Sequence, residues 1–429
     1  MAQILFFLLL LLALTTSGLR IEFIDRFSPH SPFNETAKPG SLTEKLIRQS
    51  QARMSRIKEI TSTQVNKTTI HPPFFEDQSL YLAVVGIGTG QDDRMYYLEM
   101  DTGSGVTWIQ CKPCNPCFPE QIGTFNPPDS PTYRKMACDD PLCVHPYACI
   151  TGVCKYVITY ADQSWVEGDL SRETFYFHNS SGEFETFQGL AYGCTHRYQG
   201  LEEYTGVPSG ILGLDSSPHS LVNQLIDDTH GRFSYCLFPP QVEKVKSLAF
   251  GDDIVMNGDV QTTPILHSDG FYYLKLNDIS IDGQPMNFPP GTFDRQADGT
   301  GGCIIDSGAA MSYLAGGPYD VVRNKLQSIF TLLGLVPDDT ASDDLDLCYH
   351  MREQPGLDYL PSLTFNLQDA DLLVRPEQLY VTNDQARVFC LGIFRDDRTD
   401  IGAHQQFNTR FTYDLINWQL SFVPEDCGA

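Results

Sequence analysis

Two aspartates of this chain lie in nearly the same short sequence. Asp101 begins the segment Asp-Thr-Gly-Ser, and Asp306 begins the segment Asp-Ser-Gly-Ala. Each follows a short apolar run, so each carboxylate is predicted to stand where a strand enters a turn. Two carboxylates held face to face cannot both ionise at low cost, and one of them therefore keeps a proton. Such a pair can activate a water molecule and protonate a leaving amine.

The repetition of the motif carries this interpretation. A single Asp-(Ser/Thr)-Gly is ordinary turn chemistry, and most copies only satisfy their own backbone. The two copies here are separated by about 200 residues, a spacing that suits two lobes of ordinary domain size, each supplying one aspartate. Gly103 and Gly308 let backbone amides approach the carboxylates, because a side chain there would block the approach.

Further motifs follow in a fixed order, and together they resemble the pepsin-like aspartic proteases of peptidase family A1, in particular the nepenthesin-type plant branch. The resemblance runs from about Ser79 to Cys427 and implies a mostly β, bilobal pepsin-like fold with an active-site cleft between two β lobes. Besides the two aspartate motifs, it rests on Trp108-Ile109-Gln110-Cys111, Tyr160-Ala161-Asp162-Gln163-Ser164, Gly210-Ile211-Leu212-Gly213-Leu214, Phe233-Ser234-Tyr235-Cys236 and Gly402-Ala403-His404-Gln405-Gln406.

The resemblance also implies roles for individual residues. Asp101 and Asp306 are expected to be catalytic, and Tyr160 is expected to cap the cleft from a hairpin flap with its hydroxyl available to Trp108. The alternative for Tyr160 is simple packing in a strand. The residues expected to support the two aspartates are Thr102, Gly103, Ser104, Ser307 and Gly308.

Ala309 departs from the family pattern. Ser104 is expected to donate a hydrogen bond to its neighbouring carboxylate, whereas Ala309 stands where this branch usually has Thr and offers no hydroxyl. Fewer hydrogen bonds to the charged form raise the pKa of a carboxylate. The substitution therefore predicts activity at milder acidity, and it also supports the rival hypothesis of an inactive, secreted pepsin-like inhibitor or binding protein.

The elements that must position these residues are mostly strands. Alternating and apolar runs predict strands, and helical periodicity is confined to residues 220–228 and 319–333. A Pro-rich, charged stretch at residues 239–244 marks the predicted boundary between an N-terminal lobe, residues 76–240, and a C-terminal lobe, residues 241–429. The strands are expected at residues 80–87, 153–160, 174–177, 248–250, 271–279, 363–367 and 411–413.

The first 75 residues differ in composition from the rest. Residues 1–18 contain an apolar run too short to span a bilayer comfortably, followed by small residues, which predicts a cleaved secretory signal. Residues 19–75 carry nine Lys/Arg and five Asp/Glu, whereas the remainder carries 20 basic and 49 acidic residues. We interpret residues 19–75, called the leader below, as a propeptide whose hold on an acidic body weakens as carboxylates protonate. The alternative is a disordered arm.

The cysteines indicate an oxidising compartment. The chain contains 13, and a secreted chain favours disulfides over the metal site that Cys111-x-x-Cys114-x-x-Cys117 could form. The odd thiol is predicted to be Cys303, acting as a small hydrophobe, and the resemblance suggests Cys348 with Cys390. The other candidates for disulfides are Cys111, Cys114, Cys117, Cys138, Cys143, Cys149, Cys154, Cys194, Cys236 and Cys427.

The remaining signals concern modification and partners. Asn34, Asn66 and Asn179 begin glycosylation sequons. We expect a secreted, apoplastic monomer, with the vacuole as the alternative, acting on peptide or protein substrates and bound by its own propeptide. No cofactor or metal is expected, and a strongly acidic body argues against nucleic acid. The chain has no segment beyond the signal that resembles a membrane span, and no zinc-protease, serine-hydrolase or P-loop motif.

Overall fold

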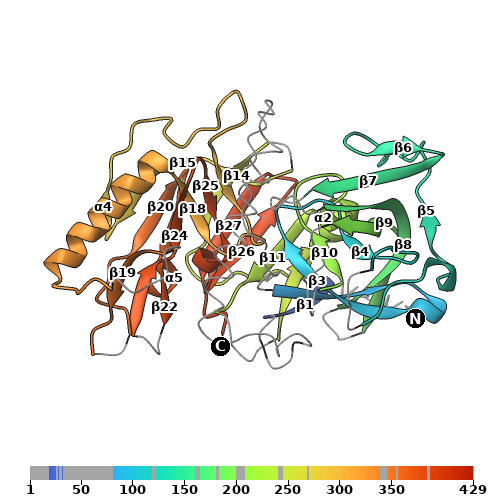
Figure 1. Cartoon of the computed structure of the whole chain (residues 1–429), viewed down its shortest axis with the longest axis horizontal. Helices are drawn as coiled ribbons and strands as arrows, with labels where there is room; N and C mark the ends of the chain where they lie inside the picture. Colours follow the sequence, from blue (N-terminus) through green and yellow to red (C-terminus); the bar gives the residue numbers. More distant parts are fainter. Residues whose placement is uncertain are drawn as a thin grey trace, which may run out of the picture.

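The computed structural model describes residues 19–25, 28, 31, 81–117, 122–159, 165–179, 183–199, 208–239, 245–267, 270–338, 345–353, 356–383 and 387–428. These residues form a mostly β molecule with two halves side by side, and the helix α4 (Gly316–Leu332) lies at the outer edge of the C-terminal half (Figure 1). The predicted fold class is confirmed. In the part of the chain that the structure describes, no helix is both long and apolar enough to cross a membrane.

The N-terminal half is built around β3 (Arg94–Asp101). It pairs antiparallel with β2 (Tyr81–Ile87) and parallel with β10 (Gly210–Gly213). Side chains alternate along β3, because Tyr96, Leu98 and Met100 are buried whereas the residues between them are partly exposed. The remaining strands of this half are β4 (Trp108–Gln110), β5 (Arg134–Lys135), β6 (Ala148–Ile150), β7 (Val153–Thr159), β8 (Trp165–Asn179) and β9 (Phe184–Gln199).

The C-terminal half repeats this plan. The strand β17 (Cys303–Ile305) pairs parallel with β25 (Thr399–Ile401), as β3 does with β10. Further strands are β13 (Gln261–Leu266), β14 (Tyr273–Leu274), β15 (Leu276–Ile281), β16 (Gln284–Pro285), β18 (Ser312–Ala315), β19 (Asp346–His350), β20 (Leu363–Leu367), β21 (Ala370–Val374), β22 (Tyr380–Asn383), β23 (Val388–Leu391) and β24 (Ile393–Asp396).

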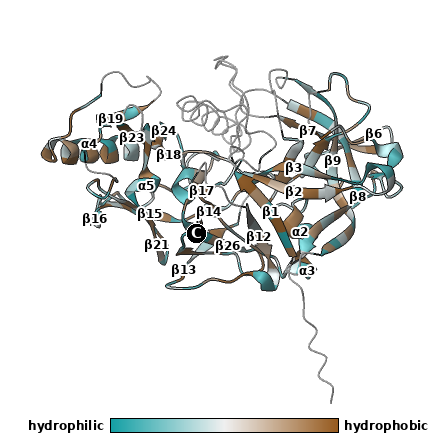
Figure 2. Cartoon of the chain, turned by 90° about the horizontal axis from the view of Figure 1, so that it is seen from below, coloured by the Kyte–Doolittle hydropathy of each residue, from teal (hydrophilic) through white to brown (hydrophobic). Residues whose placement is uncertain are grey.

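The strands between the halves join them. The strand β11 (Arg232–Cys236) pairs with both β12 (Val245–Phe250) and β26 (Thr409–Asp414), and β26 pairs with β27 (Gln419–Pro424). Buried aromatic side chains fill this region, so the two halves share one continuous core. Apolar strands such as β2 appear brown within the molecule in Figure 2. The short helices are α2 (Leu221–Gln224), α3 (Ile226–Thr229) and α5 (Pro376–Leu379).

The strand β1 (Leu19–Asp25) belongs to the same large sheet, although it comes from the start of the leader. It pairs antiparallel with β12, β2 and β8. Ile21 and Phe23 are buried, and the Phe23 ring lies 5.8 Å from Tyr81 and 5.9 Å from Phe238. The Arg20 guanidinium forms an ion pair of 2.7 Å with Asp253. The leader therefore begins as a structural strand of the body.

Several predictions fall outside the described residues. These are the signal at 1–18, the leader beyond its first strand apart from Ser28 and Ser31, the flap residue Tyr160, most of the lobe boundary, and the sequons at Asn34 and Asn66. Asn179 ends β8, where its backbone pairs with Leu19. The predicted helices correspond to α2 with α3 and to α4, and each predicted strand overlaps an observed one.

Twelve cysteines form six disulfides, and Cys303 is a buried free thiol. Burial raises the pKa of this thiol above its usual value, and Asp400 acts in the same direction. The residues 111, 114 and 117 do not converge on one centre, because Cys111 pairs with Cys194 and Cys114 pairs with Cys117. The other pairs are Cys138–Cys149, Cys143–Cys154, Cys236–Cys427 and Cys348–Cys390.

Candidate active site

The first aspartate stands at the carboxyl end of β3. The backbone carbonyl of Asp101 accepts a 2.9 Å hydrogen bond from the Leu214 amide, just beyond β10. The carboxylate accepts a 2.8 Å hydrogen bond from the Gly103 amide and a short one from the Ser104 hydroxyl. The strand thus delivers Asp101 into a turn whose own donors favour the ionised carboxylate.

The second aspartate stands in a similar turn in the other half. It follows β17, and the Asp306 amide donates to the carbonyl of Ile401 at 3.1 Å. The Gly308 amide donates to the Asp306 carboxylate at 3.0 Å, as the Gly103 amide does to Asp101.

The repeat extends beyond the motif that is visible in the sequence. Thr107 and Ser312 each lie six residues after their aspartate, and each hydroxyl accepts a hydrogen bond from a glycine amide, Gly213 at 3.1 Å and Gly402 at 2.8 Å. A β-carbon on either glycine would lie about 2.2–2.3 Å from a backbone oxygen. Glycine is therefore required at both positions, and the two halves carry the same supporting device.

Reciprocal hydrogen bonds lock the two loops together. The Thr102 amide donates to the Ser307 hydroxyl at 3.2 Å, and the Ser307 amide donates to the Thr102 hydroxyl at 2.8 Å. The Ser307 hydroxyl also reaches the carbonyl of Met100 at 3.1 Å. We call the exchange between Thr102 and Ser307 the clamp. Since each clamp residue directly follows an aspartate, the clamp brings Asp101 and Asp306 together at the junction of the halves.

The two aspartates are buried, and the side-chain donors beside them differ. Asp101 and Asp306 are almost completely inaccessible. The Ser104 hydroxyl donates to Asp101, but the equivalent Ala309, which is fully buried, has only a methyl group. The two carboxylates therefore stand in different hydrogen-bonding environments, and this difference separates an acid from a base.

Trp108 and Glu99 lie on the strands that flank the first carboxylate loop. Trp108 begins β4, close behind the first loop, and is buried. Glu99 lies two residues before Asp101 on β3, so both side chains leave the strand on the same face, opposite the one that packs Leu98 and Met100 into the core. Tyr160 lies outside the described residues, and its role as the flap stays a prediction.

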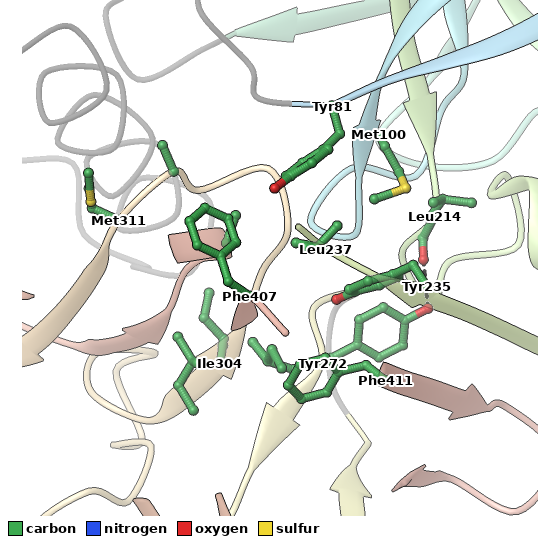
Figure 3. Close-up of a cluster of buried hydrophobic side chains, with 14 of the residues drawn as sticks. Tyr81, Met100, Leu214, Tyr235, Leu237, Tyr272, Ile304, Met311, Phe407 and Phe411 are labelled. Atoms are coloured by element: carbon green, nitrogen blue, oxygen red, sulfur yellow. Dashed lines mark hydrogen bonds between the residues drawn. The ribbon is translucent and has the colours of Figure 1, made fainter. Parts of the chain in front are cut away.

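Sequence reasoning did not identify three buried tyrosines beneath the loops. The Tyr272 hydroxyl donates to the carbonyl of Leu214 at 2.7 Å, as drawn in Figure 3. Tyr235 and Tyr413 lie beside it and share a 2.9 Å hydrogen bond. Tyr235 stands in one of the motifs that carry the family resemblance, but no local pattern indicates the partners of these tyrosines, which are between 58 and 178 positions away along the chain.

The geometry suits acid–base chemistry by carboxyl groups. Two carboxylates with unequal donors stand on loops that the clamp joins, and peptide hydrolysis needs one carboxyl group as a base and the other as an acid. Within the described ranges, no group of three or more His, Cys, Asp and Glu side chains could hold a metal ion.

Comparison with family models gives two matches. Residues 81–252 match a model described as the xylanase inhibitor N-terminal domain, and residues 271–424 match a model described as the xylanase inhibitor C-terminal domain. Together they cover most of the chain and fall on its two halves.

Curated relatives are plant proteins. Aspartic proteinase nepenthesin-2 of Nepenthes gracilis is 32% identical over 384 residues, which span 87% of this chain and 84% of that protein. The Arabidopsis thaliana protein named aspartic protease in guard cell 2 is 28% identical over 80% of this chain and 72% of its own length.

Solved structures share the fold. The crystal structure of edgp matches with a TM-score of 0.68 at 16% identity, over 84% of this chain and 97% of that one. Basic 7S globulin from soybean matches with a TM-score of 0.64 at 19% identity, over 80% of this chain and 92% of that one.

Proposed function

Because this chain belongs to the plant pepsin-like aspartic proteases of peptidase family A1, we propose that it is a secreted aspartic endopeptidase that acts at acidic pH. Asp101 and Asp306 hold a water molecule between them. The ionised member takes a proton from the water as the oxygen attacks the peptide carbonyl. The protonated member stabilises the gem-diol and then protonates the leaving nitrogen.

One observation carries this proposal. The clamp requires a hydroxyl residue after each aspartate, and the chain supplies Thr102 and Ser307, joined by hydrogen bonds of 3.2 and 2.8 Å. A pair of buried carboxylates is costly to keep without a function, because desolvation and mutual repulsion both oppose ionisation. Each lobe repeats the same supporting glycine and hydroxyl, which favours a site built around both aspartates.

The test is to replace each aspartate separately. Purified, acid-treated protein is incubated with a denatured protein substrate at several pH values, with and without a pepstatin-type transition-state mimic. We expect Asp101→Asn and Asp306→Asn to abolish cleavage while the folded state survives, because each change removes the shared proton but little volume. Ser216→Ala serves as the control, since this partly exposed serine caps only the carbonyl of Gly270. Substantial turnover by either aspartate variant would refute the pairing.

We also propose that the chain is made as a zymogen. The leader is basic and the body is acidic, so electrostatic attraction favours an inhibited state near neutral pH and weakens as carboxylates protonate. Secretion is supported by the apolar amino-terminal run and by the six disulfides. The enzyme would act on peptide or protein substrates as a monomer in the apoplast.

The rival function is a non-catalytic inhibitor or binding protein. It is favoured by Ala309, which removes a donor from the second carboxylate loop, and by family models named for xylanase inhibitors. The same acid incubation separates the two: a wild-type chain that cleaves nothing after removal of its leader would support the rival.

A further inference from the structure

Two tyrosines beneath the active site come from neighbouring strands. Tyr235 lies on β11 and Tyr413 on β26, and the register pairs Phe233 with Tyr413 and Tyr235 with Phe411. The two tyrosines are therefore diagonal neighbours on one face of the sheet between the halves. Both side chains are completely buried.

Their hydroxyls continue into the second carboxylate loop. The Tyr235 hydroxyl donates to the side-chain oxygen of Gln406 at 2.7 Å, and the Gln406 amide nitrogen donates to the carbonyl of Ile401 at 2.8 Å. That same carbonyl accepts the hydrogen bond from the Asp306 amide. A line of hydrogen bonds thus runs from Tyr235 to the backbone that holds Asp306.

The number of protons on each group fixes which atom donates and which accepts along this line of hydrogen bonds. A tyrosine hydroxyl has one proton, and Tyr235 uses its own on Gln406. The 2.9 Å bond between the two hydroxyls must then be donated by Tyr413. The Gln406 amide is oriented as well, because its nitrogen faces the carbonyl of Ile401 and only its oxygen can accept from Tyr235.

The other end of the line reaches the clamp. The Tyr413 hydroxyl lies close enough to the Thr102 side chain to interact with it. Thr102 also accepts the clamp hydrogen bond from the Ser307 amide. The line therefore connects the clamp, on the first carboxylate loop, with the strand that supports the second.

The rings are fixed by packing. Tyr413 stacks on Phe233 with ring centroids 4.5 Å apart and planes 5° from parallel, and the Tyr272 ring lies 4.5 Å from it on another side. Figure 3 shows Tyr235 and Tyr272 side by side, with the Tyr272 hydroxyl bonded to Leu214. Because Leu214 holds the backbone of Asp101, the tyrosine cluster supports both loops.

These tyrosines stay neutral. Burial raises the pKa of Tyr235 and of Tyr413, and the negative charge of Asp306 raises both further. A phenol that does not ionise cannot act as a base at acidic pH. Its contribution is the geometry that its hydrogen bonds impose.

We propose that Tyr413 and Tyr235 are positioning residues that hold the Asp306 loop in register with the clamp, so that the distance between the two catalytic carboxylates depends on their hydroxyls. This rests on the proposed function. A loosened register would misplace the shared water in the transition state more than it would weaken binding of an extended peptide, so the loss falls on kcat.

The experiment compares Tyr413→Phe and Tyr235→Phe with Tyr380→Phe. Tyr380 is an equally buried tyrosine that donates to the carbonyl of Pro361 at 3.0 Å, in a separate three-stranded sheet. We expect each of the first two variants to lower kcat about tenfold, the value of one hydrogen bond, with KM within about twofold. The control should keep both constants. Thermal unfolding verifies that each variant is folded.

The double variant tests whether the hydroxyls act as one line. If they do, removing both should cost about as much as removing one, whereas independent effects would multiply to about a hundredfold. Wild-type kcat in a folded Tyr413→Phe or Tyr235→Phe enzyme, an equal loss in the control, or a multiplied loss in the double variant would overturn the proposal. A wild-type chain without activity would instead refute the proposed protease, and the positioning role with it.

Discussion

A missing hydroxyl at Ala309 makes the two carboxylate loops unequal. Replacing it in an Ala309→Thr variant should give Asp306 a donor comparable to the one that Ser104 gives Asp101. A donor to the charged form lowers the pKa of the pair, so the acidic limb of the pH–rate profile should move downward. A hydrogen bond to a charged group contributes about 1.5–3 kcal/mol and one pKa unit is about 1.36 kcal/mol, so the expected shift at this buried site is about one to two units.

The matched variant is Ser104→Ala, which removes the existing donor and should move the same limb upward. Full pH–rate profiles of both variants and the wild type test the sign. If Ala309→Thr leaves the profile in place or moves it upward, this position does not tune the pair, and Ala309 is only a packing choice.

The two candidate catalytic residues could be predicted from the sequence because their signal is local. Asp101 and Asp306 stand in repeated tetrapeptides, and a residue type with a fixed spacing is enough to identify them. No role was predicted for Tyr413, or for Tyr235 although it stands in a family motif, because a tyrosine in a strand usually packs and their hydrogen bond joins positions 178 apart. Only the strand register between β11 and β26 brings them beneath the site.

The strand β1 is the element whose position the sequence indicated least well. Its residues alternate between buried and exposed, as Ile21, Glu22 and Phe23 illustrate, and this pattern predicts a strand but not its partners. The basic composition of the leader predicted an inhibitory propeptide on an acidic body, and this prediction specified no strand partners. The structure pairs β1 with three strands of the body.

We therefore predict that Phe23→Ala destabilises the full-length chain by about 3–5 kcal/mol, as expected for truncating a fully buried phenylalanine. The measurement is urea unfolding followed by intrinsic fluorescence. Glu22→Ala is the control, because this neighbouring side chain is exposed and should change the unfolding free energy by less than about 0.5 kcal/mol. Equal stability of the two variants would mean that β1 contributes no packing energy.

The whole molecule divides into a basic leader and an acidic body. Lowering the pH from neutral to about 4 protonates carboxylates of the acidic body, so the electrostatic attraction that holds the basic leader falls. We predict that incubation at about pH 4 leads to cleavage near residue 75. Amino-terminal sequencing of the product measures where the chain is cut. The isolated leader should inhibit when it is added back near neutral pH.

High salt at neutral pH provides a second test, because screening weakens exposed charge pairs without protonating them. It should weaken inhibition by added leader. Full activity of the uncut chain at neutral pH would contradict the proposal that the chain is a zymogen.

The bilobal fold itself was predictable from two strand-rich halves and a duplicated motif. The shared core between the halves depends on long-range strand pairing, which no local sequence pattern encodes.

Because β1 is paired with strands of the body, cleavage of the leader and its dissociation are two separate steps. A peptide bond broken near residue 75 leaves β1 joined to β2 and β12 by backbone hydrogen bonds, and Phe23 remains enclosed by aromatic rings. The nicked protein would then be a two-chain complex that migrates as a single particle under native conditions and as two bands after denaturation. Activation would proceed at the rate at which a strand leaves a sheet, so onset of activity would lag behind proteolysis.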